Sequence, residues 1–223
     1  MARKTTKRSR KLRRISYQDF RNAVTADACC AGDGSDSTTT LATLIVRDLT
    51  GAKPAEMLEA VLSQGEGTPV HGVWHHALIG EILLVCLRNA GHSITDDLLD
   101  EVIDRGRQIP GGSCGFLGAC GALSSAASAY SILLGSTPVA TDQREKLLEF
   151  AAKLVARLAE IGGSRCCKKS SYAALEGARD AFAELGFDLP EEQFAGRCPF
   201  FASNDTCDGV ACVYFPRKRR AAA

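Results

Sequence analysis

Apolar residues recur at helical spacing through most of this chain, and this pattern limits the folds open to it. Between residues 141 and 161, Leu147, Leu154 and Leu158 fall on one side of a helix, as expected where a helix faces a core. Few segments alternate with the period of two that is typical of strands. The sequence therefore predicts an all-α fold, a compact bundle of several helices joined by loops rich in Gly and Cys. Further helices are predicted over 38–48, 54–64, 71–89, 95–106, 118–134 and 170–185.

The predicted helices divide the chain into three parts. Residues 1–36 are a basic tail and linker, residues 37–190 the helical domain, and residues 191–223 a loop-rich segment that contains cysteines and ends in basic residues. A chain of 223 residues is long enough to bury a sizeable core. No membrane span is predicted, because no stretch of about 18 residues is uninterrupted by polar side chains.

The basic residues are concentrated at the ends of the chain. Residues 1–14 hold eight Lys or Arg and no acid, and residues 217–220 hold four more, so the body is acidic although the net charge is +1. Blocks of like charge are usually disordered and often contact nucleic acid or an acidic partner. Because no folded nucleic-acid motif accompanies them, the sequence favours solvated tails, or tails that contact the acidic body, over RNA binding.

Ten cysteines are many for a chain with this N-terminal sequence. The basic start is not followed by the apolar run of a secretory signal, which predicts a cytoplasmic protein. Structural disulfides are then not expected, and metal binding or catalysis becomes the favoured use of the thiols.

Two glycine-rich loops carry the most informative cysteines. The first reads GGSCGFLGAC at 111–120, and the second reads GGSRCCKK at 162–169. Glycine lets the backbone approach a bulky partner closely, and a helix start favours thiolate over thiol. The pattern suggests a metal, an iron–sulfur cluster or direct thiol chemistry. We predict one pocket that contains two cysteines of the first loop and at least one of the second; the candidates are Cys114, Cys120, Cys166 and Cys167.

Three histidines on the predicted 71–89 helix add nitrogen donors. His71 and His75 are four residues apart and share a helix face, a spacing that suits metal binding. We expect His75 or His76 to lie near the cysteine pocket. Glu81 follows one to two turns later as a carboxylate ligand or base.

Three cysteines of the C-terminal segment form a second candidate group. Cys198, Cys207 and Cys212 have eight and four residues between them, and with one more ligand they would form a second metal site that pins this segment. The alternative is a reduced, partly ordered terminus. Positive side chains also surround the cysteine pair of the second loop, where they lower a thiol pKa and balance cluster charge; these are Arg165, Lys168 and Lys169.

The chain resembles an uncharacterised prokaryotic family, a cysteine-rich domain of unknown function met mainly in anaerobes. The resemblance covers roughly residues 50–215 and lies in HGVWHH at 71–76, RG at 105–106, PGGSCGF at 110–116, GACGA at 118–122, TP at 137–138 and IGGSRCCK at 161–168. Such domains often occur beside, or fused to, radical-SAM proteins and SAM-dependent methyltransferases. The first loop is also similar to the redox family named for its C-GCAxxG-C-C pattern, although ACG stands at 119–121 in place of GCA.

This resemblance implies a metal or iron–sulfur role in anaerobic metabolism, with a radical-SAM or methyltransferase partner. Three functional hypotheses are considered. The first is an accessory protein that holds an iron–sulfur cluster, with zinc as the alternative, and serves a partner enzyme. The second is a thiol oxidoreductase or sulfur carrier that uses the loop cysteines directly. A third treats the basic tails as an RNA-binding or docking device on a structural protein.

Overall fold

The computed structural model describes residues 37–64 and 71–217, and within these ranges it contains helices and no strand. The all-α prediction is confirmed. The basic tail before residue 37 and the end after residue 217 lie outside the described residues, and so do the predictions made for them. The helices are α2 (Ser37–Asp48), α3 (Pro54–Gln64), α4 (Trp74–Asn89), α5 (Asp96–Arg107), α6 (Ser113–Phe116), α7 (Gly121–Leu134), α8 (Thr141–Ile161) and α9 (Cys167–Ala183), followed by the short 3-10 helices η1 (Pro199–Ser203) and η2 (Gly209–Ala211).

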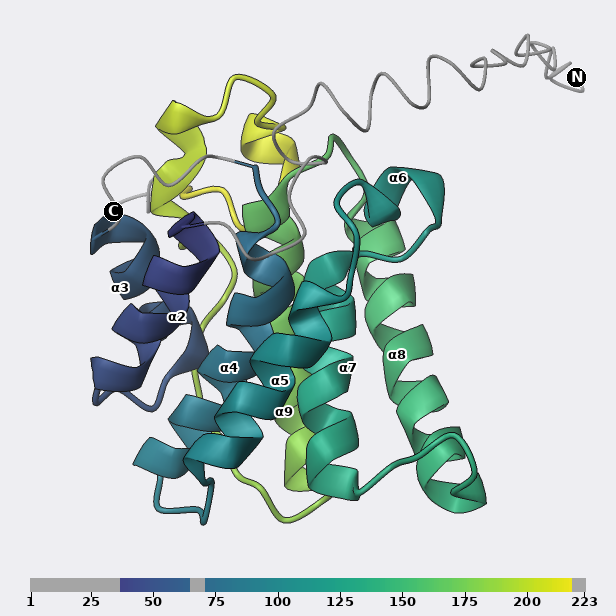
Figure 1. Ribbon diagram of the computed structural model, residues 1–223. Helices are drawn as coiled ribbons and strands as arrows, with labels where there is room; N and C mark the ends of the chain where they lie inside the picture. Colours follow the sequence, from purple (N-terminus) through teal and green to yellow (C-terminus); the bar gives the residue numbers. More distant parts are fainter. Residues whose placement is uncertain (1–36, 65–70, 218–223) are drawn as a thin grey trace, which may run out of the picture.

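Helix α4 lies at the centre of the bundle. It packs against α2, α3, α5, α7 and α9, and every residue from Trp74 to Leu87 is buried. Helices α2 and α3 lie on one side of it, and α8 lies at the opposite edge, packed on α7 and α9 (Figure 1). A helix that is apolar on every face must be enclosed in this way.

Small residues let two helices approach α4 very closely. A β-carbon on Gly106 of α5 would lie 2.2 Å from the backbone oxygen of His76, and one on Gly80 of α4 would lie 2.7 Å from the backbone oxygen of Ser125 in α7. The Gly80 N–H also donates a hydrogen bond to the Ser125 hydroxyl over 2.8 Å. At both crossings the helices therefore approach until backbone meets backbone.

Three helices begin about one turn away from the predicted residue, and one of them is α7, which starts at Gly121 rather than at residue 118. Helix α4 starts at Trp74, so His71 lies before it and does not share a helix face with His75. Helix α9 starts at Cys167, with Cys166 as the N-cap residue. The predicted start at residue 170 is therefore wrong, and the Cys166 sulfur caps the helix by accepting a hydrogen bond from the Lys169 N–H over 3.4 Å.

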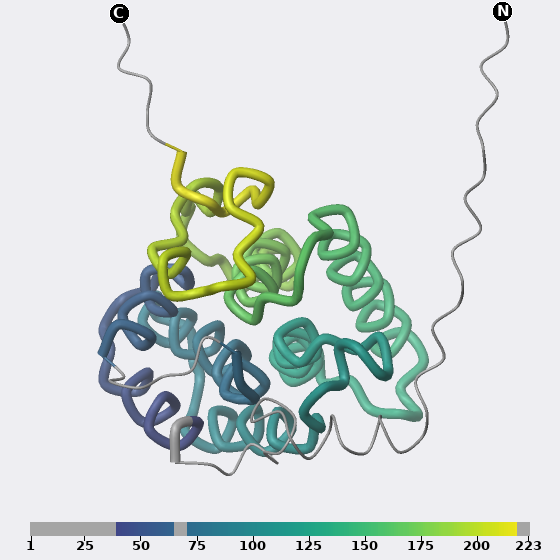
Figure 2. Tube along the Cα trace, turned by 90° about the horizontal axis from the view of Figure 1, so that it is seen from above, coloured from purple at the N-terminus to yellow at the C-terminus, as the bar shows by residue number. Residues whose placement is uncertain are grey.

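The segment after α9 folds back across one end of the bundle (Figures 1 and 2). The Arg197 guanidinium binds the Glu59 carboxylate of α3 over 2.6 and 2.9 Å, and the Tyr214 hydroxyl donates to Glu176 of α9 over 2.8 Å. Backbone hydrogen bonds join Gly196 to Val213 and Cys198 to Tyr214. Residues 213–214 are thus held against 196–198 by backbone hydrogen bonds.

No helix in the described ranges combines the length and the apolar character that crossing a bilayer requires.

The close crossing of α5 and α4 predicts a specific sensitivity at Gly106. Gly106→Ala should lower the free energy of unfolding by about 1–3 kcal/mol, because the added methyl group would meet backbone that cannot move aside. Gly115→Ala is the matched control, since a β-carbon there would meet nothing within 4 Å. Urea unfolding followed by circular dichroism measures both variants, and equal midpoints would contradict the crossing.

Candidate functional site

The cysteines of both loops and of the C-terminal segment gather at the end of the bundle where α8 stops and α9 begins. They line two pockets. The larger pocket, of about 250 Å³, is lined by His75, Cys114, Cys120, Cys166 and Cys167. The small pocket, of about 20 Å³, is lined by Cys166, Cys198, Cys207 and Cys212. Cys166 therefore lies between the two, whereas Cys167 belongs to the larger pocket alone.

Four elements bring donors to the larger pocket. Cys114 lies on α6, Cys120 is the N-cap residue of α7, Cys167 is the first residue of α9, and His75 is the second residue of α4. Cys120 and Cys167 are buried, and Cys114 is exposed. The two glycine-rich loops thus meet, with a histidine of the central helix beneath them.

His75 has an unsatisfied nitrogen. Its side chain is only 4% exposed, and its Nδ1 atom has no hydrogen-bond partner among the described residues. Leaving a buried polar atom without a partner costs about 1–3 kcal/mol. Such a cost, next to three cysteines, is an indication of a binding site.

His76 lies beside the larger pocket but does not line it. Its Nδ1–H donates to the Ile109 carbonyl over 2.9 Å, and its ring lies so close to α7 that a β-carbon on Gly121 would be 1.9 Å from its Cδ2 atom. Burial, and secondly the neighbouring His75, lower the pKa of His76 to about 4. His76 is therefore a neutral residue that packs behind His75. The centroids of the two imidazole rings are 4.4 Å apart.

The thiols of the larger pocket lie close enough to affect one another. Burial raises the pKa of Cys114, and the neighbouring Cys120 and Cys167 raise it further, while Arg165 lowers it. Without a bound metal ion, Cys114 therefore carries its proton at neutral pH. A metal ion would reverse this balance, because a coordinated thiol loses its proton.

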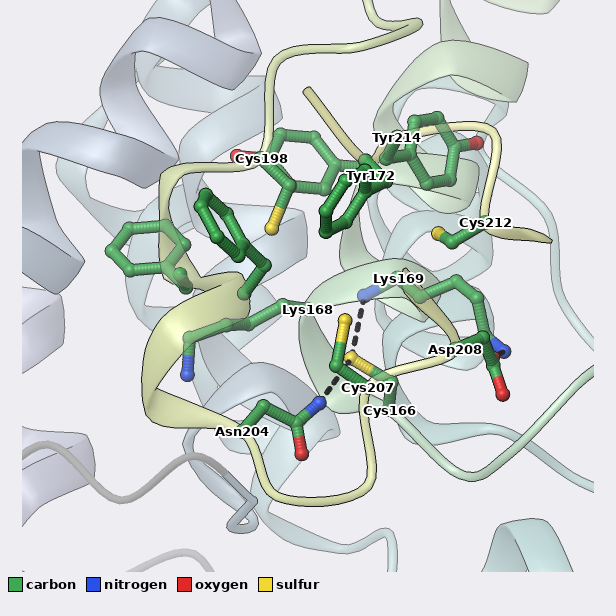
Figure 3. Close-up of a pocket in the computed structure, with 13 residues that line it drawn as sticks. Cys166, Lys168, Lys169, Tyr172, Cys198, Asn204, Cys207, Asp208, Cys212 and Tyr214 are labelled. Atoms are coloured by element: carbon green, nitrogen blue, oxygen red, sulfur yellow. Dashed lines mark hydrogen bonds and ion pairs between the residues drawn. The ribbon is translucent and has the colours of Figure 1, made fainter. Parts of the chain in front are cut away.

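The small pocket is formed by the start of α9 and the C-terminal segment (Figure 3). The sulfur atoms of Cys166, Cys198, Cys207 and Cys212 point into the same space. Aromatic side chains enclose this space, among them Tyr172, Phe200 and Tyr214.

Hydrogen bonds from N–H groups reach three of these four sulfurs. Cys166 accepts from the Lys169 N–H over 3.4 Å and from the Asn204 amide over 3.6 Å. Cys207 accepts from the Gly209 N–H over 3.4 Å, and Cys198 accepts from the backbone of Phe200. Burial nevertheless raises the pKa of Cys198, to about 11.

The loop that precedes α9 is fastened to the C-terminal segment by a buried ion pair. The Lys169 ammonium donates to Asp208 over 2.8 Å and to the carbonyls of Gly162 and Ser164. Hydrogen bonds from Lys169 and from the Ser164 N–H lower the pKa of Asp208 to about 2. Gly163, with φ of +80°, leaves room for this contact, because a β-carbon there would lie 2.3 Å from the Asp208 carboxylate.

The other cations predicted to balance charge are placed differently. The Lys168 ammonium is buried, 5.7 Å from the Trp74 ring and 5.3 Å from the Phe200 ring. Burial lowers the pKa of Lys168, whereas Cys166 and other nearby cysteines raise it. Arg165 lines the larger pocket.

The sulfur atoms of each pocket lie near one another, but they are not arranged as the ligands of a bound metal ion. Within residues 37–64 and 71–217, no three His, Cys, Asp or Glu side chains converge as tightly as a shared metal ion requires. A metal in either pocket must therefore draw its ligands together, as is common where metal binding and folding are coupled.

The sequence did not indicate a role for Asn204 or Asp208, or the hydrogen bond from the Gly209 N–H to the Cys207 sulfur. A signal for the last was present, because Asp-Gly after Cys207 is a turn sequence that directs N–H groups back toward the preceding side chain. The sequence also suggested Glu81 as a ligand or base of the site. Its side chain is instead fully buried, with its carboxylate 2.9 Å from the Arg47 guanidinium, and it lines neither pocket.

One known protein family matches most of this chain. Residues 43–215 match the family of unknown function DUF5714, and the chain belongs to that family. The prediction of a domain of unknown function is confirmed. No curated protein and no solved structure matched the chain.

Buried Glu81 predicts a pH dependence of stability. Burial raises its pKa from 4.5 to about 8, although Arg47 opposes the shift. The folded protein therefore holds this proton more tightly than the unfolded chain, and the stabilising contribution is complete below pH 4.5 and lost as the pH rises through 8. Urea unfolding at pH 5 and pH 9 should show a smaller loss of stability in Glu81→Gln than in the unmodified protein. Equal losses in the two proteins would show that Glu81 does not titrate in this range.

Proposed function

We propose that this protein binds an iron–sulfur cluster in the larger pocket and serves a partner enzyme as an accessory protein. Cys114, Cys120 and Cys167 would bind the cluster, with His75 as the fourth donor. The observation that carries the proposal is the buried His75 nitrogen, which has no partner among the described residues and lies beside three cysteines from three separate elements.

The residues present suit such a group. Thiolates are the usual ligands of iron–sulfur clusters, and imidazole can replace a thiolate. A pocket of about 250 Å³ offers room for more than a single ion. Arg165 lines this pocket and would offset the negative charge of a thiolate-bound cluster. When bound, a cluster would supply one-electron transfer, and zinc is the competing occupant because His75 suits it equally well.

The proposal of a partner rests on the family resemblance and on access to the pocket. Cys114 lies exposed at its rim, so the occupant would be open to a second protein. The resemblance favours a partner of the radical-SAM or SAM-dependent methyltransferase type, in the cytoplasm of an anaerobe. Nucleic acid is not favoured as the partner.

Protein produced and purified without oxygen should contain iron and acid-labile sulfide, with a broad brown absorption that air abolishes. Cys114→Ser and Cys167→Ser should lose most of the iron and sulfide, because each removes a ligand. Cys86→Ser is the control and should keep them, since Cys86 is buried on α4 and lines neither pocket.

Two results of this experiment would decide against the cluster. Zinc in place of iron, lost in the same two variants, would make the larger pocket a zinc site. Protein with neither metal bound there, and with all its thiols free to titrate, would leave the thiol-redox function as the explanation for the pocket.

That second function, a thiol oxidoreductase or sulfur carrier, is favoured by one observation. Exposed Cys114 lies close enough to buried Cys120 and Cys167 for their charges to affect its pKa. In such a reaction two thiols of this protein would form a disulfide, while a substrate disulfide takes up two electrons and two protons.

The raised pKa of Cys114 opposes this role and gives its own prediction. In metal-free protein, Cys114 should react with iodoacetamide more slowly at pH 7 than an exposed thiol of ordinary pKa, and the rate should rise steeply above pH 9 because only the thiolate reacts. Peptide mapping by mass spectrometry measures the rate at each cysteine. Fast labelling at pH 7 would instead support direct thiol chemistry.

A further inference from the structure

We infer that Cys166, Cys198, Cys207 and Cys212 form a structural zinc site that fastens the C-terminal segment to the start of α9. This site lies beside the larger pocket and shares Cys166 with its lining, but its four ligands do not include the proposed cluster ligands Cys114, Cys120 and Cys167. The ligand missing from the three C-terminal cysteines is thus Cys166, the N-cap residue of α9, which lies 32 positions before Cys198.

The donor set and the space both select a single ion. Four thiolates around one closed position are a common arrangement of structural zinc. The four sulfurs here point into one enclosed space, and its volume of about 20 Å³ suits one water-sized guest (Figure 3). A space of this size favours a single zinc ion over a multinuclear cluster.

The backbone around the cysteines is arranged as a support for thiolate ligands. Cys198 and Cys207 each accept a hydrogen bond from the backbone two residues further on, at Phe200 and Gly209. Cys166 accepts one from Lys169 at the first turn of α9. Hydrogen bonds of this kind fix the orientation of metal ligands and favour the charged form of the sulfur.

The charge of the occupied site would also be balanced. Zinc with four thiolates carries a net charge of about −2. Lys168 lies near Cys166 and Cys198, close enough for their thiolate forms to raise its pKa. Lys169 also lines this pocket, and its buried ammonium is paired with Asp208.

Zinc would also explain why this irregular segment folds. Residues 190–217 contain only two 3-10 helices, of five and three residues. In the described chain the four sulfurs are not yet at coordination distance, so the ion would pull three points of the segment toward α9. The free energy of zinc binding would then stabilise this part of the fold directly.

The adjacent pair Cys166 and Cys167 offers a matched test. Full-length protein and its variants are purified under reducing conditions, and zinc is measured by mass spectrometry of the metal. Cys166→Ser and Cys207→Ser should lose the zinc ion, whereas Cys167→Ser and Cys86→Ser should retain it. Iron content, measured in the same samples, should show the reverse for Cys166 and Cys167, so failure of the cluster proposal is distinguishable from failure of this one.

A second measurement on the unmodified protein covers variants that do not fold. Added Co²⁺ should produce the intense thiolate-to-cobalt absorption of a tetrahedral site, and added Zn²⁺ should abolish it. With zinc bound, alkylation should spare Cys166, Cys198, Cys207 and Cys212, and a chelator should expose all four together.

Three results would overturn the inference. One is unchanged alkylation of these four cysteines with and without zinc. Another is zinc that Cys167→Ser removes and Cys207→Ser does not. The third is a disulfide between any two of the four in protein purified with reductant, detected by non-reducing peptide mapping.

Discussion

Helix α4 is buried from Trp74 to Leu87, so every polar group on it must find its partner inside the protein. Glu81 meets Arg47 at the contact with α2, and His76 donates to the Ile109 carbonyl. The Gly80 N–H reaches the Ser125 hydroxyl on α7. Two side-chain atoms of this helix lack a partner within the described part of the chain, Glu81 Oε2 and His75 Nδ1, and of the two residues only His75 lines the cysteine pocket. The burial that holds the bundle together therefore also marks the place where a ligand belongs.

The bounds of a helix could be predicted from the sequence where local interactions set them. The bounds of α3 and α8 agree with prediction, because apolar periodicity and flanking Pro or Gly act within one helix. The start of α9 could not be predicted in this way. Cysteine is not among the residues usually expected at an N-cap, yet the Cys166 sulfur takes that place and the hydroxyl of Ser171 donates to the Cys167 carbonyl instead.

The cysteine end of the molecule was predictable only in part. Glycine-rich loops before Cys114 and Cys166 indicated close approach, and these loops do line a common pocket. The association of Cys166 with the C-terminal cysteines could not be read from spacing, because it depends on how the segment returns to the bundle. That return is set by contacts such as Arg197 with Glu59, 138 positions apart, which no local pattern reveals.

Cys166 lines both pockets, Cys167 lines the larger pocket alone, and the two residues share one peptide bond. Their α-carbons are held about 3.8 Å apart by a planar unit that cannot stretch. A backbone rotation that brings one sulfur toward its pocket therefore also turns the neighbouring residue, and with it the first turn of α9. The two pockets are mechanically joined at this point, and a change in the occupant of one alters the position from which the other receives its ligand.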